Sequence, residues 1–550
     1  MSHKSSGRKA TPMPVYPIPF NGPATSLPSK EEVGSKAYNL MVIAQHGLPV
    51  PPGFVLGTQV CRNYFEHGRH ALDGLEAILA TELERVGAAM GRRFGDAKRP
   101  LLVSVRSGAA VSMPGMMETV LNVGLSQDAV QGMIRLTGNP RLALDCRRRL
   151  VEQFAQVVNG AALEPFEAIV AERLRHDELS HPHQLDTEAL REVCVATLVQ
   201  YETATGKRFS EDPMQQLTST IEAVLQSWSS ERAKSYRCLN GIADDAGTAV
   251  TVQAMVFGNA GPSSGSGVGF TRNPADGSNL LYVDYLPNAQ GEDVVAGRRN
   301  ALGAADLERR LPAAYAGLLE RRVVLEQAFG DMQDFEFTVE DGHLYILQCR
   351  SGKRTPLAAL RIAHDLVAEG LITPQAALAQ LAHVDTDGIE TTQLTPGAGV
   401  SPLAHGVPAS AGVIVGAVVL DPARIETIKA HSKAVILVRE HAETGDISAL
   451  SQSGGLITRF GARTSHAAVV ARQLGKVCLV GCEALAIDAS LRSCRFGDTV
   501  INEGDIISVD GGQGTIYAGA VSIEHTKPKE LLAEVRRWRK LKSAGVSASR

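Results

Sequence analysis

The sequence predicts a multidomain α/β protein. Its 550 residues exceed one ordinary domain of about 100–200 residues, so we expect three or four units. Short apolar strands bounded by turn residues alternate with helical stretches along much of the chain. Hydrophobic residues make up 44%, charged residues 21% and aromatic residues 5%, a globular composition that excludes disordered, collagen-like and coiled-coil classes.

Net charge and targeting signals limit which binding partners and which cellular compartment we expect. The 55 Lys and Arg against 59 Asp and Glu give 55 − 59 = −4, so no basic field indicates a nucleic-acid partner. No apolar run of signal-peptide or membrane-spanning length occurs, and we expect a cytoplasmic protein without a membrane partner. The eight cysteines have no C-x-x-C or zinc-type spacing, so we expect reduced, structural thiols. Glycine is enriched: it makes up 53 of the 550 residues, about 10%, whereas the average in proteins is about 7%.

The first expected elements are a helix and two strands. Residues 1–28 contain six prolines and little periodicity, so we expect an extended or disordered lead-in and order after Pro28. Ser29 and Glu32 have the S-x-x-E spacing of a capping box, which predicts a helix start, and Gly47 ends that helix. The next expected elements are strands at 53–56 and 101–105 and a mainly helical stretch at 142–229 with a polar break near 181–183.

The pattern becomes β-rich after Gly247. Expected strands at 248–257 and 268–271 flank the glycine-rich loop 258–267, whose unhindered N–H groups suit phosphate oxygens. A hairpin is expected at about 334–349, a helical connector at 357–367 and a linker at 385–403. Beyond the linker, short apolar strands at 412–420, 434–438, 455–458, 477–480 and 506–509 alternate with helical pieces. They predict a compact α/β or β/β/α domain ending near Val521, followed by a charged helix at 529–541.

The hairpin carries polar residues whose shared face depends on its turn. Asp334 and Glu336 alternate with apolar residues and therefore lie on one face of their strand. A two-residue turn at 341–342 would send Gln348 and Arg350 to the opposite face. A three-residue turn at 340–342 would place Asp334 opposite Gln348 and gather all four side chains. We predict the second register.

The sharpest chemical motif is Thr464-Ser465-His466 ahead of an Ala/Val-rich helix. Ser465 or Thr464 can cap that helix, so a phosphoryl group on the His466 imidazole would meet free backbone N–H groups and the positive end of the helix dipole. A nucleophilic histidine that carries an anion benefits from that position. Taken alone, the same three residues are more often a simple helix cap.

The longer run at 454–476 resembles the phosphohistidine signature shared by pyruvate phosphate dikinase, phosphoenolpyruvate synthase and enzyme I of the sugar phosphotransferase system. Eight further blocks resemble the nucleotide-binding domain of pyruvate phosphate dikinase: 33–40, 47–54, 102–117, 245–250, 253–258, 270–274, 288–297 and 348–355. The resemblance implies an ATP-grasp domain at 29–355 with a helical insertion at about 142–229, a connector at 356–403, a swivelling phosphohistidine domain at 404–521, and a helix and tail at 522–550. The linker at 385–403 is expected to absorb the swivelling motion.

The resemblance also assigns roles to single residues. It implies that His466 accepts a phosphoryl group from ATP, with Mg²⁺ as the metal ion. By position, the nucleotide and phosphoryl-transfer residues are Lys36, Arg106, Gly265, Gly267, Asp334, Glu336, Gln348 and Arg350, of which Asp334, Glu336 and Gln348 are the expected metal ligands. Arg106 and Arg350 join His466 as expected catalytic residues. Thr464 matches a position that regulatory kinases phosphorylate in some dikinases, and it could equally be only a helix cap.

Two departures from the family pattern qualify this resemblance. Ala462 and Arg463 replace the usual glycine and methionine, and an extra cation beside His466 should favour its phosphorylated form. In pyruvate phosphate dikinase the chain continues into a barrel domain for phosphoenolpyruvate, whereas this sequence stops at the helix leading there. We therefore expect one half of a split enzyme, served by a separate PEP/pyruvate-binding protein. A homodimer is also expected, because the family is commonly dimeric.

The leading hypothesis is a pyruvate phosphate dikinase-like phosphotransferase. ATP and phosphate would react with His466 to give AMP, pyrophosphate and phosphohistidine, which then passes its phosphoryl group to pyruvate or another acceptor. One alternative is a phosphate-independent, synthase-like dikinase. The other is a catalytically silent nucleotide-binding subunit.

Overall fold

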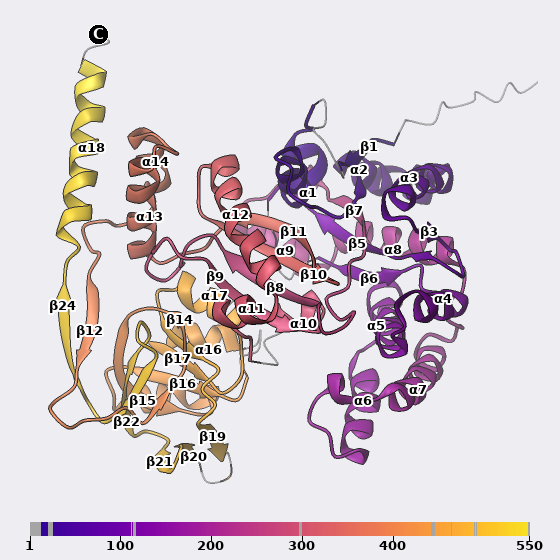
Figure 1. The fold of residues 1–550 in the computed structure, drawn as a ribbon. Helices are drawn as coiled ribbons and strands as arrows, with labels where there is room; N and C mark the ends of the chain where they lie inside the picture. The colour runs from indigo at the N-terminus through magenta and orange to yellow at the C-terminus, as the bar shows by residue number, and fades with distance from the viewer. Residues whose placement is uncertain are drawn as a thin grey trace, which may run out of the picture. The chain divides into compact units, whose positions relative to one another are not determined.

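The computed structural model describes residues 13–19, 26–111, 113, 117–295, 300–441, 446–463, 465–488, 490 and 492–547. The chain divides into two compact units, the first holding Met1–Val256 with Tyr345–Gln348 and the second Phe257–Leu344 with Cys349–Arg550. Both units combine helices and sheets, as the sequence predicts (Figure 1). Every helix in the described ranges is too short or too polar to cross a membrane.

The first unit is built on a five-stranded antiparallel sheet. In spatial order its strands are β1 (Val15–Ile18), β2 (Gly53–Leu56), β7 (Ala249–Ala254), β5 (Val103–Gly108) and β6 (Thr119–Val123). The lead-in is extended rather than disordered at β1, whose four residues pair with β2, so the expectation that order begins only after Pro28 is wrong. Two further short strands, β3 (Arg93–Phe94) and β4 (Pro100–Leu101), pair in parallel.

Nine helices of the first unit are described. They are α1 (Lys30–Gln45), α2 (Thr58–His67), α3 (Leu75–Met90), α4 (Gln127–Thr137), α5 (Pro140–Asn159), α6 (Glu164–His176), α7 (Thr187–Thr205), α8 (Pro213–Ser227) and α9 (Glu231–Asn240). The predicted capping box is confirmed, since Ser29 Oγ accepts from Glu32 N at 3.3 Å and Glu32 Oε2 accepts from Ser29 N at 2.8 Å. The helical stretch and its break are also confirmed, with a 3₁₀ turn (Pro182–Gln184) between α6 and α7.

The second unit begins with a four-stranded antiparallel sheet. Its spatial order is β11 (His343–Ser351), β10 (Gln333–Glu340), β8 (Gly265–Phe270) and β9 (Tyr282–Pro287). The helices that follow β9 and precede β10 are α10 (Gly291–Val295), α11 (Ala304–Arg310) and α12 (Pro312–Phe329). Two rows of paired residues cross the sheet, Tyr282–Phe270–Asp334 and Asp284–Val268–Glu336. Directly paired residues share a face, and so do residues two apart, so these six side chains lie on one face of the sheet.

The glycine-rich segment differs from its predicted form. Gly265 and Gly267 lie inside β8 rather than in the loop, which spans 258–264. A Cβ on Gly265 would come within 2.2 Å of the Tyr285 ring, and one on Gly267 within 2.4 Å of the Phe337 ring. Close packing of aromatic rings therefore requires these two glycines, independently of any phosphate.

The hairpin turn also differs from its prediction. The turn has two residues, Asp341 and Gly342, with φ of +46° and +81°, so the predicted three-residue turn is wrong. Such a turn places Met332 opposite Ser351, yet the N–H of Gly352 donates to Met332 O at 3.0 Å. One extra residue in β11 therefore shifts the register beyond the turn. The extra residue explains why Arg350 still faces Asp334.

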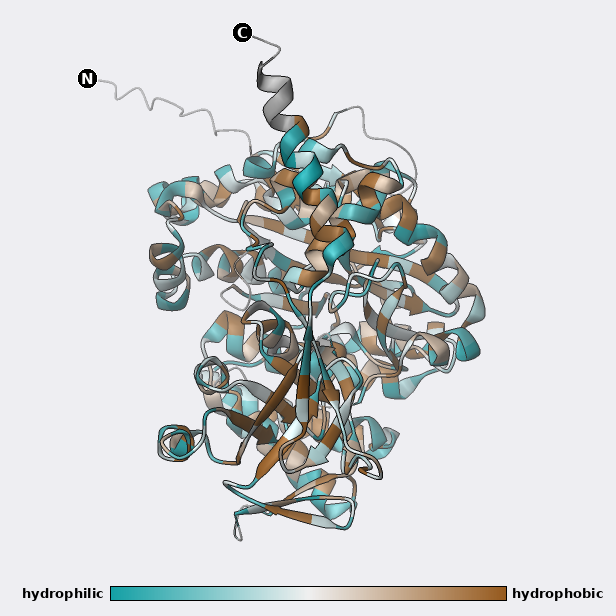
Figure 2. Cartoon of the chain, turned by 90° about the vertical axis from the view of Figure 1, so that its left-hand side faces the viewer, coloured by the Kyte–Doolittle hydropathy of each residue, from teal (hydrophilic) through white to brown (hydrophobic). Residues whose placement is uncertain are grey.

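The connector and the chain's last helix pack together. The connector helices α13 (Pro356–Ala368) and α14 (Pro374–Gln380) share a core with Leu532, Val535 and Trp538 of α18 (Lys529–Ser547). Polar residues also line α18, which Figure 2 shows as a mixture of hydrophilic and hydrophobic colours. The linker expected at 385–403 is not loose throughout, because β12 (Thr391–Thr395) pairs with β24 (Ser522–Thr526) in an antiparallel ribbon (Figure 1). This ribbon joins the segment that enters residues 404–521 to the one that leaves it.

Residues 404–521 form a mixed eight-stranded sheet with short helices. The spatial order is β13 (Ala404–His405), β23 (Thr515–Ala518), β22 (Ile506–Asp510), β15 (Val413–Val419), β16 (Val435–Arg439), β17 (Gly455–Thr458), β18 (Val477–Val480) and β14 (Val407–Ser410). Strands β15 to β18 are parallel and alternate with α15 (Ile425–Lys429), α16 (Ile447–Gln452) and α17 (His466–Gln473). A smaller sheet contains β19 (Leu485–Asp488), β20 (Ser493–Phe496) and β21 (Thr499–Asn502). All five strands predicted for this region are confirmed.

Candidate functional site

Helix α17 begins at His466, as the motif predicts. Ser465 is the N-cap residue, and its Oγ accepts from Ala468 N at 3.4 Å. Ala468 and Ala471 pack α17 onto the sheet beside Cys478 and Val480. The helix follows β17 in a parallel β-α-β arrangement, so its N-terminus lies beyond the carboxyl end of that strand, where such folds place anion sites. Thr464, the proposed regulatory residue, lies outside the described residues.

Arg463, two residues before the cap, does not serve as a spare cation for His466. Its Nε donates to Asp284 Oδ1 at 2.7 Å, and its Nη2 donates to Val283 O, both on β9. The guanidinium carbon also lies 4.1 Å from the centre of the Tyr282 ring. The expectation that Arg463 stabilises phosphohistidine is therefore wrong for this conformation, because a carboxylate already neutralises it. Arg463 instead holds the turn before α17 against β9.

Neighbouring contacts strengthen this attachment. Tyr282 Oη donates to Pro408 O at 2.8 Å, and burial raises the Tyr282 pKa to about 12, so its phenol stays neutral. The N–H of Gly461 donates to Asn300 Oδ1 at 3.3 Å, while Asn300 Nδ2 donates to Glu483 Oε1 at 3.4 Å. We name Arg463, Gly461, Tyr282, Asp284 and Asn300 the docking cluster. It fixes residues 404–521 on the face of the sheet that carries Tyr282 and Asp284.

The predicted carboxylates lie on that same face. Asp334 is 4% exposed and accepts from Arg350 Nε at 2.8 Å, so these two predicted residues are brought together. Burial raises the Asp334 pKa, Arg350 and Arg472 oppose that shift, and nearby Glu336 adds to it. Glu336, half-buried, lies two residues along the strand from Asp334.

This charge balance bears on the expected magnesium ion. In the part of the chain that the structure describes, no three His, Cys, Asp or Glu side chains are grouped to hold a metal. Mg²⁺ is nevertheless commonly held by one or two carboxylates together with substrate phosphates. Asp334 and Glu336 fit that pattern in chemistry and in shared face. Their role as metal ligands stays a prediction.

Three predicted residues belong to the first unit: Lys36 on α1, Arg106 on β5 and Gln348 on β11. Gly34 lies in a kink of α1 with φ +77°, and a Cβ there would come within 2.2 Å of Gly108 O. The N–H of Ser35 donates to Ala109 O at 3.0 Å. These contacts bring the segment that carries Lys36 beside the end of β5, two residues from Arg106. The functional roles of these residues stay predictions.

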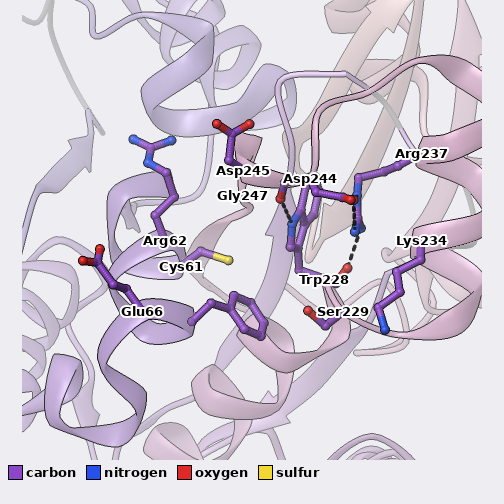
Figure 3. Close-up of a pocket in the computed structure, with 11 residues that line it drawn as sticks. Cys61, Arg62, Glu66, Trp228, Ser229, Lys234, Arg237, Asp244, Asp245 and Gly247 are labelled. Carbon is purple, nitrogen blue, oxygen red and sulfur yellow. Dashed lines mark hydrogen bonds and ion pairs between the residues drawn. The ribbon is translucent and has the colours of Figure 1, made fainter.

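The first unit also contains a cavity of about 520 Å³ between α2 and α9 (Figure 3). The Trp228 indole N–H donates to Asp244 O at 2.9 Å, and the Arg237 guanidinium lies 4.3 Å from the Trp228 ring centre. Arg237 Nε also donates to Asp244 Oδ1 at 2.8 Å. None of the predicted catalytic, nucleotide-binding or metal-binding residues lines this cavity. Arg237 and Asp244 instead link α9 to Trp228 at the end of α8.

Three residues that contact Arg463 in the turn before α17 were not predicted from the sequence: Tyr282, Asp284 and Arg472. For two of these residues the sequence contains a pattern that indicates a buried charge. Asp284 is a charged residue within an apolar strand, and Arg472 is a charged residue in an Ala/Val-rich helix. A charge in such a pattern indicates a buried partner.

Comparisons with known proteins match both parts of the chain. Residues 73–301 match the family model "Pyruvate phosphate dikinase, AMP/ATP-binding domain", and residues 431–514 match "PEP-utilising enzyme, mobile domain". The chain is 41% identical over 509 residues to a pyruvate, phosphate dikinase of Giardia intestinalis, with 92% of this chain and 57% of that protein covered.

The chain belongs to the pyruvate phosphate dikinase family. A Clostridium symbiosum dikinase is 38% identical over 509 residues, covering 92% of this chain and 58% of that protein. A chloroplastic dikinase of Mesembryanthemum crystallinum is 41% identical over 500 residues, covering 90% and 52%. The chain thus spans a little over half the length of these dikinases. The predicted family is confirmed.

Proposed function

We propose that this protein is a dikinase-type phosphotransferase that uses ATP and phosphate to phosphorylate His466. The observation that carries the proposal is the placement of α17. Its capped N-terminus begins at His466, and the docking cluster holds the preceding turn on the sheet face that carries Asp334 and Glu336. The histidine segment is therefore attached to the sheet that bears the predicted residues Asp334, Glu336 and Arg350.

The proposed reaction balances in two steps. The His466 imidazole attacks the β-phosphorus of ATP, the bond between the α- and β-phosphoryl groups breaks, and AMP leaves. Phosphate then attacks the γ-phosphorus of the histidine-bound pyrophosphoryl group, and pyrophosphate leaves. The β-phosphoryl group remains on His466. The imidazole proton is lost to solvent or to a nearby base during the first step.

The residues of the chain supply binding and charge for these steps. Arg350 is held by Asp334 and provides a fixed guanidinium at the carboxylate pair, where it can neutralise charge on a transferred phosphoryl group. Lys36, Arg106 and Gln348 are proposed to bind the nucleotide. The backbone N–H groups at the start of α17 favour an anion on residue 466.

Mg²⁺ is proposed to be held by Asp334 and Glu336, with Gln348 as a further ligand. When bound, the ion would supply charge neutralisation for the phosphate oxygens of ATP. The raised Asp334 pKa supports this assignment, because a cation would relieve the cost of its buried charge.

The final acceptor is proposed to be pyruvate, which would become phosphoenolpyruvate. The names of the related dikinases support this choice. Because the chain spans only 57% and 58% of those relatives, the pyruvate step is tested separately, by adding a purified PEP/pyruvate-binding domain in trans.

The test uses ATP labelled with ³²P at the β position, with and without phosphate. Wild-type protein should acquire acid-labile label and release AMP, and phosphate should be required for pyrophosphate release. The His466→Ala variant should stay unlabelled. EDTA should abolish labelling if Mg²⁺ is required.

Three outcomes would redirect the proposal. If the protein is labelled without releasing pyrophosphate, and added phosphate does not change the labelling, the reaction is the synthase-like one. Binding of ATP without any acid-labile label would indicate a silent nucleotide-binding subunit. Equal labelling of His466→Ala would refute the assignment of the phosphorylated residue.

A further inference from the structure

A second cavity of the first unit, of about 340 Å³, is lined by residues of α5, α7, α8 and the segment between α7 and α8. Its wall holds three bases and one acid, a formal charge of +2 in a chain whose formal net charge is −4. These four residues are Arg69, Lys207, Arg208 and Glu222. Positive charge gathered at one hollow of an acidic protein favours the binding of an anion there.

The charges on this wall differ in how far the fold already neutralises them. Glu222 is paired with Arg69, whose Nη2 lies 2.7 Å from Glu222 Oε2. Arg208 lies 3.7 Å from Glu202, but the two side chains are 90% and 58% exposed, so this ion pair contributes little. The Lys207 ammonium has no acidic or hydrogen-bonding partner among the residues that the structure describes. Lys207 and Arg208 therefore supply the positive charge that a ligand would meet.

The backbone that carries Lys207 and Arg208 is held on both sides. Thr205 Oγ1 accepts from Lys207 N at 3.2 Å and donates to Lys207 O at 3.1 Å. Phe209, the next residue after Arg208, is 7% exposed and packs edge-on against Tyr201, with 5.3 Å between the ring centres. Because the backbone is already fixed, a ligand would mainly have to order the two side chains, which lowers the entropic cost of binding.

The rest of the wall indicates the body of the ligand. Several neutral amides and hydroxyls line the cavity: Asn159, Ser210, Gln215, Ser219 and Gln226. Such groups both donate and accept hydrogen bonds, which suits the hydroxyl groups of a sugar. The volume equals that of about eleven water molecules at about 30 Å³ each, so a bare phosphate ion would leave most of the cavity filled with water. The cavity therefore fits a phosphate group together with a polar organic body.

We propose that this cavity binds a phosphorylated sugar. The phosphate group is bound by Lys207 and by Arg208, whose guanidinium can donate two N–H groups to it. The sugar hydroxyls contact the amides and hydroxyls of α5 and α8. None of the predicted nucleotide or metal residues takes part, and binding here does not require phosphorylation of His466.

Isothermal titration calorimetry of the full-length protein tests the site, with glucose 6-phosphate, ribose 5-phosphate, glucose and inorganic phosphate as probes. We expect at least one of the two sugar phosphates to bind with a Kd on the order of 0.1–1 mM, and glucose and inorganic phosphate to bind at least about tenfold more weakly. Lys207→Gln and Arg208→Gln should each weaken sugar phosphate binding about tenfold, the effect of losing one hydrogen bond to a charged group.

Two further variants separate a bound ligand from unspecific attraction. Arg191→Gln is the matched control, because Arg191 is an exposed arginine of α7 that pairs with Glu188 at 3.1 Å and lies outside the cavity wall. Its Kd should stay within about twofold of wild type. Ser219→Leu adds apolar bulk to the wall and leaves every charge in place, so it should weaken binding at least about tenfold. Circular dichroism checks that each variant is folded.

The outcomes that would overturn the proposal are distinct. An unchanged Kd in both Lys207→Gln and Arg208→Gln, or in a folded Ser219→Leu, would show that the ligand binds elsewhere. If Ser219→Leu does not fold, the two charge variants decide the location. Inorganic phosphate that binds as tightly as the sugar phosphates would overturn the assignment of a sugar phosphate. Absence of binding of both sugar phosphates to wild type at about 10 mM would overturn the site itself.

Discussion

The ion pair between Arg463 and Asp284 should control how firmly residues 404–521 are attached to the sheet β8–β11. The two side chains are 18% and 3% exposed, so the pair is largely desolvated. Exposed pairs contribute about 0–1 kcal/mol, whereas breaking a buried pair costs about 3–5 kcal/mol. For this partly buried pair we expect a coupling energy on the order of 2–3 kcal/mol.

The Gly461 amide offers a local measure of detachment. Its N–H donates to Asn300 Oδ1 at 3.3 Å, a bond that belongs to the docking cluster and is lost when the cluster opens. A loss of about 2–3 kcal/mol corresponds to a roughly 30- to 150-fold rise in the opening constant. Hydrogen exchange at Gly461 should accelerate by that factor in Arg463→Met and Asp284→Asn.

The double variant completes a thermodynamic cycle, and Arg459→Met is the matched control. Arg459 pairs with Glu440 at 3.4 Å, but the two side chains are 38% and 37% exposed. Its loss should change Gly461 exchange by less than about fivefold. A coupling energy below about 0.5 kcal/mol between Arg463 and Asp284 would refute the docking argument.

Three further predictions concern stability and thiol reactivity. Gly34→Ala should lower the free energy of unfolding by about 2–4 kcal/mol, because φ is +77° and the new Cβ meets Gly108 O. Gly47→Ala is the control, since Gly47 has the same φ but open space around it, and it should cost about 1 kcal/mol. Urea denaturation measures both values. Burial acts to raise the Asp145 pKa, but Arg149 and Arg148 outweigh it and hold that pKa below its usual range. Asp145 therefore contributes stability above its unfolded pKa of about 3.9 that is lost as the pH falls through the folded pKa, so the gap between wild type and Asp145→Asn should narrow below about pH 4. Cys238 is the exposed one of eight free cysteines, and burial raises the pKa of thiols such as Cys349 to about 12, so a thiol reagent should label one site in the native protein and none in Cys238→Ser.

Local signals in the sequence were sufficient for many of these features. The capping box at Ser29 and the helix start at His466 depend on residues within one helical turn of each other, so their spacing is visible in the chain. The apolar strands of residues 404–521 likewise follow from short runs of buried residues. The family follows from long ordered blocks, and the comparisons confirm it.

The tertiary structure decided which distant groups meet. The sequence offered Arg463 as a free cation, but the fold neutralises it with Asp284, 179 positions away. Part of the expected linker forms β12, because β24, more than a hundred residues later in the chain, supplies its hydrogen-bond partners. Periodicity identifies the face that a residue presents, but the partner of a buried charge or an edge strand is chosen by packing across the whole chain. For that reason the sequence alone determined the family and the helix start at His466, whereas the fold determined which charged groups are paired.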